Sequence, residues 1–187
     1  MPEAPTLFLL HGWGSDASDL FGMAEPLGLP HSLVALQGPD RHPGGSGWSW
    51  FDIGWTEGGV SLDTDGARAR AAMLADTISE YPRPWTVVGF SQGAMMAALL
   101  LAERPERVDR AVLIAGMLLP GVEAAEGPRR SALVTHGRQD EVVPYAEGER
   151  MARALAERHE VSFVPDAGGH GVSLPQLLAI GAFLGRE

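Results

Sequence analysis

Gly89-Phe90-Ser91-Gln92-Gly93 is the stretch that decides the fold of this chain. It follows the apolar run Trp85-Thr86-Val87-Val88 and precedes a run of alanine, methionine and leucine from 94 to 101. A short apolar run, a glycine-flanked turn and a longer apolar run are typical of a strand, a tight turn and a helix. Glycines two residues before and after the serine let the backbone turn sharply and approach its neighbours closely. The stretch therefore predicts a serine raised on a strained turn between a strand and a helix.

A serine held in this way is a candidate nucleophile. Its hydroxyl stands clear of the sheet, and the following helix directs its N-terminal amides to the place where an oxyanion would form. The alternative is an ordinary strand-to-helix turn in which the serine only caps the helix. A catalytic role requires an acid and then a histidine further along the chain.

Asp140 and His170 supply the acid and the histidine in that order. Asp140 follows a predicted strand at 131–136, and His170 lies in a glycine-rich loop after a predicted strand at 160–164. The carboxyl ends of parallel strands meet at one edge of a sheet. We therefore expect Ser91, Asp140 and His170 to lie close together.

Neighbouring acids and histidines have other expected roles. Glu141 is the alternative acid, but Asp140 is favoured because it lies nearer the end of the strand. Asp166 precedes His170 by a few residues, and a short carboxylate in such a loop favours a capping role. His136 lies at the strand end itself, where a local structural role is expected.

A second candidate feature is His11-Gly12-Trp13-Gly14, which directly follows an apolar run at 6–10. An oxyanion needs two preorganised backbone donors, one of them the residue after the nucleophile, which is Gln92. The other comes from a loop after an early strand, and this stretch is in the right place. Whether Trp13 or one of the two glycines donates is open, and so is the alternative that the stretch is only a tight turn.

Six short segments, in order along the chain, carry a resemblance to a known family. They resemble motifs of the small carboxylesterase/phospholipase branch of the α/β-hydrolases, which includes the acyl-protein thioesterases. The segments are Leu9-Leu10-His11-Gly12-Trp13-Gly14-Ser15-Asp16, Trp50-Phe51-Asp52-Ile53, Gly89-Phe90-Ser91-Gln92-Gly93, Ala115-Gly116-Met117-Leu118-Leu119-Pro120, His136-Gly137-Arg138-Gln139-Asp140-Glu141-Val142-Val143-Pro144 and Gly169-His170.

This resemblance implies that Ser91, Asp140 and His170 form a catalytic triad. It also implies that the backbone N–H groups of Trp13 and Gln92 form the oxyanion hole. The family's fold and its use of ester substrates are further expectations.

Two positions depart from the family's pattern. Ala115 replaces a serine after the next strand, and Ala94 stands where a second glycine is frequent. The chain is also shorter than typical members. These departures leave the triad chemistry unchanged and bear on substrate preference.

The segment 38–60 is expected to be a long irregular loop after a strand end. It is rich in proline, glycine and aromatic residues, and long loops in compact domains are usually functional. We expect its aromatic side chains, and apolar ones after the strand at 109–115, either to line a substrate pocket or to pack beneath the loops. The candidate pocket residues are Trp48, Trp50, Phe51, Met117 and Leu118.

Length and composition limit the class of protein. At 187 residues, the chain is expected to form one domain spanning 1–187. A net charge of −10 opposes nucleic acid and anionic membranes as partners. The chain has no long apolar run and begins without an apolar leader, which predicts no membrane span and a cytoplasmic location. Scattered histidines and zero cysteines predict no metal site, and no cofactor is expected.

The alternation of elements predicts a mostly parallel sheet of about six strands with helices on both faces. The resemblance implies that this is an α/β-hydrolase fold, with a trimmed sheet and no lid domain. The predicted strands are 6–10, 32–36, 85–89, 109–115, 131–136 and 160–164. The predicted helices are 16–27, 66–80, 92–104, 146–158 and 173–184.

These features together predict a serine hydrolase acting on a small-molecule carboxylic ester with a short or medium acyl chain. A thioesterase or lysophospholipase that prefers longer acyl chains is one alternative. A catalytically silent scaffold that only binds a ligand is another, because folds host more than one function. A C–C hydrolase or haloperoxidase built on the same triad is a further alternative, and the oligomeric state is left unassigned.

Overall fold

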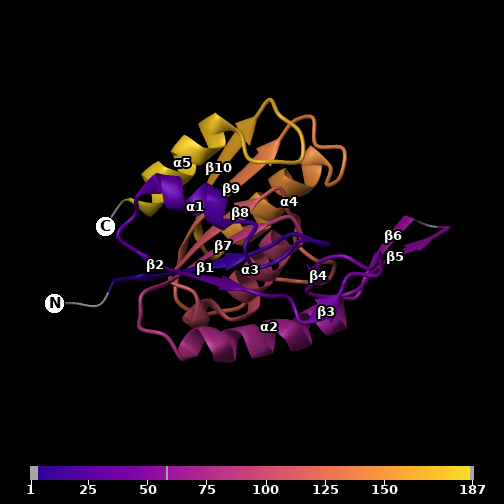
Figure 1. Ribbon diagram of the computed structural model, residues 1–187, viewed down its shortest axis with the longest axis horizontal. Helices are drawn as coiled ribbons and strands as arrows, with labels where there is room; N and C mark the ends of the chain where they lie inside the picture. The colour runs from indigo at the N-terminus through magenta and orange to yellow at the C-terminus, as the bar shows by residue number, and fades with distance from the viewer. Residues whose placement is uncertain (1–3, 58, 186–187) are drawn as a thin grey trace.

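A six-stranded sheet runs through the centre of the protein (Figure 1), which is described by a computed structural model over residues 4–57 and 59–185. The strand order is β10-β9-β8-β7-β1-β2, and every neighbouring pair is parallel. The predicted parallel sheet of six strands is therefore confirmed. The strands are β1 (Thr6–Leu10), β2 (Ser32–Leu36), β7 (Trp85–Phe90), β8 (Arg110–Ile114), β9 (Ser131–Gly137) and β10 (Glu160–Asp166).

Side chains of the central strands alternate between two hydrophobic cores, one on each face of the sheet. In β1, Phe8 and Leu10 belong to one core, and Leu7 and Leu9 belong to the other. Successive side chains of a strand point to opposite faces, so a strand buried on both sides is apolar throughout. This is why the apolar runs in the sequence identified the strands.

Helices cover both faces of the sheet, as predicted. One core includes apolar residues of α2, α3 and α4, and the opposite core includes residues of α1 and α5. Within the described residues, no helical lid is inserted between the strands. The helices are α1 (Phe21–Ala24), α2 (Thr64–Ser79), α3 (Gln92–Glu103), α4 (Tyr145–Ala156) and α5 (Leu174–Leu184), with 3-10 turns η1 (Glu25–Leu27) and η2 (Pro105–Arg107).

The predicted helix over 16–27 is wrong, because α1 is a single turn that η1 continues. The Asp16 carboxylate accepts hydrogen bonds from the N–H and the hydroxyl of Ser18, at 2.8 and 2.5 Å. Such local side-chain bonds offer the backbone an alternative to a helix. Gly28 then ends η1 in the left-handed conformation, with φ of 57°.

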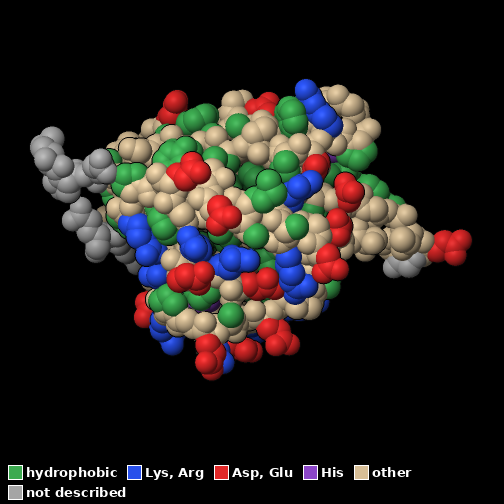
Figure 2. Space-filling view, turned by 90° about the horizontal axis from the view of Figure 1, so that it is seen from below, with side chains coloured by type: hydrophobic (Ala, Val, Ile, Leu, Met, Phe, Trp, Pro, Cys, Tyr) green, Lys and Arg blue, Asp and Glu red, His purple; other side chains and the backbone are tan. Residues whose placement is uncertain are grey.

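The segment 38–60 contains paired strands, which corrects the prediction of an irregular loop. β3 (Asp40–Arg41) pairs with β4 (Trp48–Ser49), and β5 (Ile53–Thr56) pairs with β6 (Gly59–Leu62), both in antiparallel hairpins. The β5–β6 hairpin projects from the body of the molecule (Figures 1 and 2). Strands this short give too few residues for an alternating pattern to be recognised.

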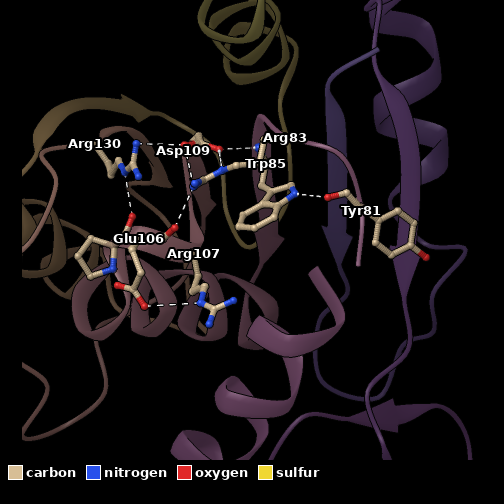
Figure 3. A network of polar contacts seen from close by, with 8 residues as sticks. Tyr81, Arg83, Trp85, Glu106, Arg107, Asp109 and Arg130 are labelled. Carbon is tan, nitrogen blue, oxygen red and sulfur yellow. Dashed lines mark hydrogen bonds and ion pairs between the residues drawn. The ribbon is translucent and has the colours of Figure 1, made fainter. Parts of the chain in front are cut away.

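Asp109 ties three strands together at the amino edge of the sheet (Figure 3). Its carboxylate accepts a hydrogen bond from the Trp85 N–H at 2.8 Å and pairs with Arg83 at 3.1 Å and Arg130 at 3.0 Å. Trp85 begins β7, Asp109 precedes β8 and Arg130 precedes β9. The amino ends of these strands are thus fixed by charge pairs.

The face covered by α2 carries interleaved basic and acidic side chains (Figure 2). Arg68 pairs with Glu103 at 2.9 Å, and Arg70 pairs with Asp40 at 2.9 Å. Such a mixture is typical of a solvated face, where single pairs contribute little stability. No helix in the described part of the chain is long and apolar enough to span a bilayer.

Candidate active site

Ser91 lies on the tight turn between β7 and α3, with φ of 53° and ψ of −115°. Few residues with a side chain adopt this conformation, so the surrounding structure must hold it. A Cβ on Gly93 would lie 2.0 Å from the Leu10 carbonyl oxygen, and one on Gly89 would lie 2.2 Å from the Gly93 carbonyl oxygen. Both glycines are therefore required by the close approach of the backbone at this turn.

Ser91, His170 and Asp140 lie in a continuous chain of hydrogen-bond distances. His170 Nε2 lies 3.0 Å from Ser91 Oγ, and His170 Nδ1 lies 2.8 Å from Asp140 Oδ2. The three residues follow the carboxyl ends of β7, β10 and β9. The Asp140 side chain is fully buried, whereas the His170 side chain is 18% exposed. The imidazole can therefore be reached from solvent while the carboxylate cannot.

Hydrogen bonds on both oxygens orient Asp140 toward His170. The N–H groups of Val142 and Val143 donate to Oδ1 at 2.9 and 2.8 Å. Behind the carboxylate, His136 Nε2 lies 2.8 Å from the Val143 carbonyl oxygen and 3.3 Å from Asp140 Oδ2. Because this nitrogen faces two oxygen acceptors, it carries a proton and can donate to either of them.

The loop that carries His170 is fixed against the loop after β9. The Gln139 N–H donates to the Gly168 carbonyl at 2.9 Å. The Asp166 carboxylate accepts a hydrogen bond from the Gly168 N–H at 2.7 Å, which is the loop role expected for it. The ring of Phe90 packs against the imidazole of His170, with the ring centroids 5.0 Å apart. These contacts restrict the imidazole to the position facing Ser91.

Backbone donors near Ser91 differ in their availability. Across residues 4–57 and 59–185, the N–H groups of Trp13 and Gln92 donate to no other protein group. The Gly14 N–H, in contrast, donates to the Trp48 carbonyl at 2.9 Å, which makes it unavailable as an oxyanion donor. Gln92 directly follows Ser91 and begins α3, whose N-terminus favours negative charge. A Cβ on Gly12, the neighbour of Trp13, would lie 3.5 Å from Ser91 Cβ, so the loop at 11–14 lies close to the serine. An oxyanion hole requires two free donors near the nucleophile.

The side chain of Trp13 contacts the segment that contains the two hairpins. Its ring centroid lies 4.1 Å from that of His42 and 5.4 Å from that of Trp55. The β5–β6 hairpin thus rests on the same loop that presents the Trp13 N–H.

His11 precedes this loop and is buried in a defined protonation state. Its Nε2 accepts hydrogen bonds from the Gly38 N–H at 2.9 Å and the Gln37 side-chain amide at 3.1 Å. Since Nε2 accepts, the proton lies on Nδ1, which donates to the Gly12 carbonyl at 2.7 Å. Burial lowers the pKa of His11 and outweighs the Gly12 carbonyl and the nearby acids, which raise it. The ring is therefore neutral and connects the loop at 11–14 to the residues that follow β2.

Of the candidate pocket residues, Trp50 and Phe51 lie in the hydrophobic core, where they are 3% and 2% exposed. They offer almost no side-chain surface to a ligand. Trp48 is half-buried, and the Arg41 guanidinium carbon lies 3.9 Å from the centre of its ring.

Met117 and Leu118 are half-buried. They follow Gly116, where a Cβ would lie 3.2 Å from the Ser91 carbonyl oxygen. These two side chains therefore stay candidates for a wall beside Ser91.

Two cavities lie at opposite edges of the sheet. One of about 320 Å³ adjoins His170 and is lined by residues 166 and 168–173. Another, of about 660 Å³, is lined by Arg110, His159 and Phe183 among others, at the amino ends of the strands and away from Ser91. Of these two cavities, only the first is lined by a residue of the candidate site, which is His170.

The fold and this site define an α/β-hydrolase. The chain belongs to the phospholipase/carboxylesterase family, whose model matches residues 1–184. The family comprises hydrolases of the carboxylesterase, phospholipase and thioesterase type.

Solved structures of three enzymes are similar to the chain over almost its whole length. The carboxylesterase of Bacillus cereus is 24% identical, with a TM-score of 0.85 over 97% of this chain and 87% of the other. Esterase PE8 is 26% identical, with a TM-score of 0.83 and coverage of 97% and 91%. The acyl-protein thioesterase 2 of Zea mays is 23% identical, with a TM-score of 0.74 and coverage of 97% and 93%.

Some contacts of the site were not anticipated from the sequence. The side chain of Gln92 bonds to the backbone at Trp50 and Phe51, and His136 lies against Asp140. Buried polar side chains must find hydrogen-bond partners, so polar residues inside apolar runs were the available signal. That signal indicates that a residue forms a hydrogen bond, but it does not identify the group to which the residue bonds.

Proposed function

We propose that the protein is a serine esterase that cleaves small carboxylic esters with short or medium acyl chains. The observation that supports this most is the chain of hydrogen-bond distances from Asp140 through His170 to Ser91. A weakly nucleophilic hydroxyl is activated when a base lies within hydrogen-bond reach and a third group orients that base. The family membership of the chain agrees with ester hydrolysis.

In the first half of the proposed reaction, Ser91 Oγ attacks the ester carbonyl carbon while His170 Nε2 takes the hydroxyl proton. Asp140 holds the proton on Nδ1, which keeps Nε2 free to accept, and stabilises the imidazolium that forms. The carbonyl oxygen becomes an oxyanion that accepts hydrogen bonds from the Trp13 and Gln92 N–H groups. Collapse of this intermediate expels the alcohol, which receives the proton from His170 and leaves an acyl-enzyme.

In the second half, water attacks the acyl-enzyme and His170 takes a proton from it. The second oxyanion occupies the same donors, and its collapse releases the carboxylic acid and restores the Ser91 hydroxyl. We place the acyl or alcohol group beside Met117 and Leu118, because they are the half-buried apolar side chains that follow Gly116 next to Ser91.

The test is labelling with a fluorophosphonate, which reacts with activated serines, read by intact mass. Wild-type protein should gain one adduct, and Ser91→Ala should gain none while keeping its thermal melting temperature. A folded wild-type protein that gains no adduct would contradict the proposal and favour a silent binding scaffold.

A second candidate function is a thioesterase or lysophospholipase, favoured by the structural similarity to the maize acyl-protein thioesterase 2. p-Nitrophenyl esters and matched thioesters from C2 to C12 separate the two. Highest kcat/KM for esters of C8 or shorter supports the esterase. Preference for acyl groups of C10 or longer, or for thioesters, would replace it with the second candidate.

A further inference from the structure

Trp50 makes hydrogen bonds to both sides of the candidate oxyanion hole. Its indole Nε1–H donates to the His11 carbonyl at 2.9 Å, and its backbone N–H donates to Gln92 Oε1 at 2.9 Å. His11 begins the loop that presents Trp13, and Gln92 is the residue after Ser91. One residue thus connects the two backbone segments that carry the proposed oxyanion donors.

The Gln92 side chain completes this connection. Its Nε2 donates to the Phe51 carbonyl at 2.7 Å, so both ends of the amide are used by consecutive residues of the 50–51 segment. A side-chain amide with both ends bonded to the backbone is held in one orientation. The start of α3 and the Trp50 backbone are therefore fixed relative to each other.

The loop at His11 is held from the opposite side as well. The His11 ring is fixed through its hydrogen bonds to Gly38 and Gly12, and its centroid lies 5.2 Å from that of Trp50. The indole is 3% exposed, so its donor has no water to replace the His11 carbonyl as partner. Loss of the indole N–H would leave the buried His11 carbonyl without this hydrogen bond. The loop at 11–14 would then lose one of its supports.

We propose that Trp50 is a positioning residue of the oxyanion hole. Its two hydrogen bonds set the distance between the N–H donors of Trp13 and Gln92. This role rests on the proposed esterase function. Donors stabilise an oxyanion only when they already point to its position, and small displacements are costly in rate. The role differs from lining a substrate pocket, since the buried ring acts through the loop.

Trp50→Phe tests this role because it keeps an aromatic ring in the core and removes the N–H donor. Trp85→Phe is its matched control. Trp85 is 7% exposed, belongs to the same core, and donates through its indole N–H to the Tyr81 carbonyl at 2.8 Å (Figure 3). It lies at the amino end of β7, whereas Ser91 follows the carboxyl end. The two variants lose equivalent bonds at opposite edges of the sheet.

The measured quantities are kcat and KM for a p-nitrophenyl ester, and Ki for a trifluoromethyl ketone. The ketone adds to the serine and places a negatively charged oxygen in the oxyanion hole. For Trp50→Phe, kcat should fall about 10- to 100-fold with KM within about twofold, and Ki should rise by a similar factor. For Trp85→Phe, kcat, KM and Ki should stay within about twofold of wild type, although both variants lower the melting temperature.

Trp50→Phe with wild-type kcat and Ki would overturn the positioning role while leaving the esterase proposal intact. A fall in kcat equal to that of Trp85→Phe would overturn it too, since a structural loss alone would then account for it. Wild-type protein that is neither labelled by fluorophosphonate nor hydrolyses esters would overturn the function and this inference with it.

If Trp50→Phe does not fold, Gln92→Met is the second variant. It keeps the backbone N–H of residue 92 and removes both side-chain bonds to the 50–51 segment. The same fall in kcat, rise in Ki and nearly unchanged KM are expected. Wild-type values of kcat and Ki would overturn the inference.

Discussion

Asp140 and Asp109 lie at opposite edges of the same sheet, and their partners differ in kind. Asp140 is fully buried and bonds to two backbone N–H groups and to His170, with the ring of His136 behind it. Asp109 is 19% exposed and pairs with the guanidinium groups of Arg83 and Arg130. One carboxylate faces an imidazole that can gain a charge, and the other faces permanent cations.

This difference separates a group that can take part in a reaction from one that holds the fold together. A carboxylate that is already paired with two arginines stabilises a further, developing cation only weakly. A carboxylate held by backbone dipoles keeps its charge available to stabilise an imidazolium. We therefore expect substitutions at the carboxyl edge to change the rate, and those at the amino edge to change stability.

Asp140→Asn should have the largest effect, a fall in kcat of about 10⁴-fold, because an amide donor facing Nδ1 favours the wrong tautomer of His170. The Asn side-chain oxygen can still accept from the Val142 and Val143 N–H groups, so the melting temperature should change little. The measurement is kcat on a p-nitrophenyl ester, with Glu141→Gln as the matched control. A loss of less than tenfold would show that Asp140 is not the acid of the triad.

Asp109→Asn should lower the free energy of unfolding by about 1–3 kcal/mol, because one amide oxygen cannot serve the Trp85 N–H and two guanidinium groups together. The partial exposure of the pairs keeps the expected loss below that of a fully buried ion pair. Urea unfolding measures the loss, and kcat at a temperature where the variant is folded should stay within twofold. A large fall in kcat would contradict the expectation that substitutions at the amino edge change stability and leave the rate unchanged.

Acid should destabilise the fold through histidines at both edges. Burial lowers the pKa of His11, His31 and His159 below 6.5. The unfolded chain then binds more protons than the folded chain below about pH 6.5, so the free energy of unfolding falls as the pH falls. The slope is at most about 1.4 kcal/mol per pH unit for each histidine.

Urea unfolding from pH 8 to pH 5.5 checks this dependence. His159→Leu removes the buried histidine of the amino edge. The free energy of unfolding of this variant should depend less steeply on pH, and the contribution of His11 to the slope should remain. A wild-type stability that is flat or rises toward pH 5.5 would contradict the prediction.

Ser173→Ala should have the smallest effect, a loss of about 1 kcal/mol in the free energy of unfolding. Ser173 Oγ accepts a hydrogen bond from the Gln176 N–H at 3.3 Å, and the Gln176 side chain accepts one from the Ser173 N–H at 2.9 Å. This cap begins α5 shortly after His170. Asp63→Ala, which removes the Gly66 bond that caps α2, is the control at a helix away from Ser91.

Both caps should cost similar stability, and both variants should keep wild-type kcat when folded, since Asp140 and Phe90 hold His170 without the cap. A selective fall in kcat for Ser173→Ala would mean that the helix cap also positions the histidine.

The sheet and most helices could be predicted from the sequence because strands buried on both faces are apolar throughout. The predicted helix over 16–27 failed because Asp16 and Ser18 bond locally, a competition that apolar periodicity does not register. The prediction of an irregular loop over 38–60 failed for a different reason, because this segment contributes to two hairpins. Their strands of two to four residues depend on pairing rather than on their own pattern.

The candidate site was predictable where turn chemistry and chain order limit it. Ser91, Asp140 and His170 were identified by their positions after strand ends and by their order along the chain, and the structure brings them together. Trp50 was expected either to line a pocket or to pack beneath the loops, and it lies in the core, bonded to His11 and Gln92. Its aromatic character was visible in the sequence, but the direction of its N–H was not.

By itself, the sequence determined the order of strands and helices and the residues that follow the strand ends, because apolar periodicity and turn residues act over a few neighbours. Only the tertiary structure decided which polar groups meet. Trp50 contacts His11, although the two are far apart in the chain. The different roles of Asp140 and Asp109 likewise depend on partners that are distant in the sequence. Such contacts are set by the parallel register and the packing of two cores, and local sequence does not encode them.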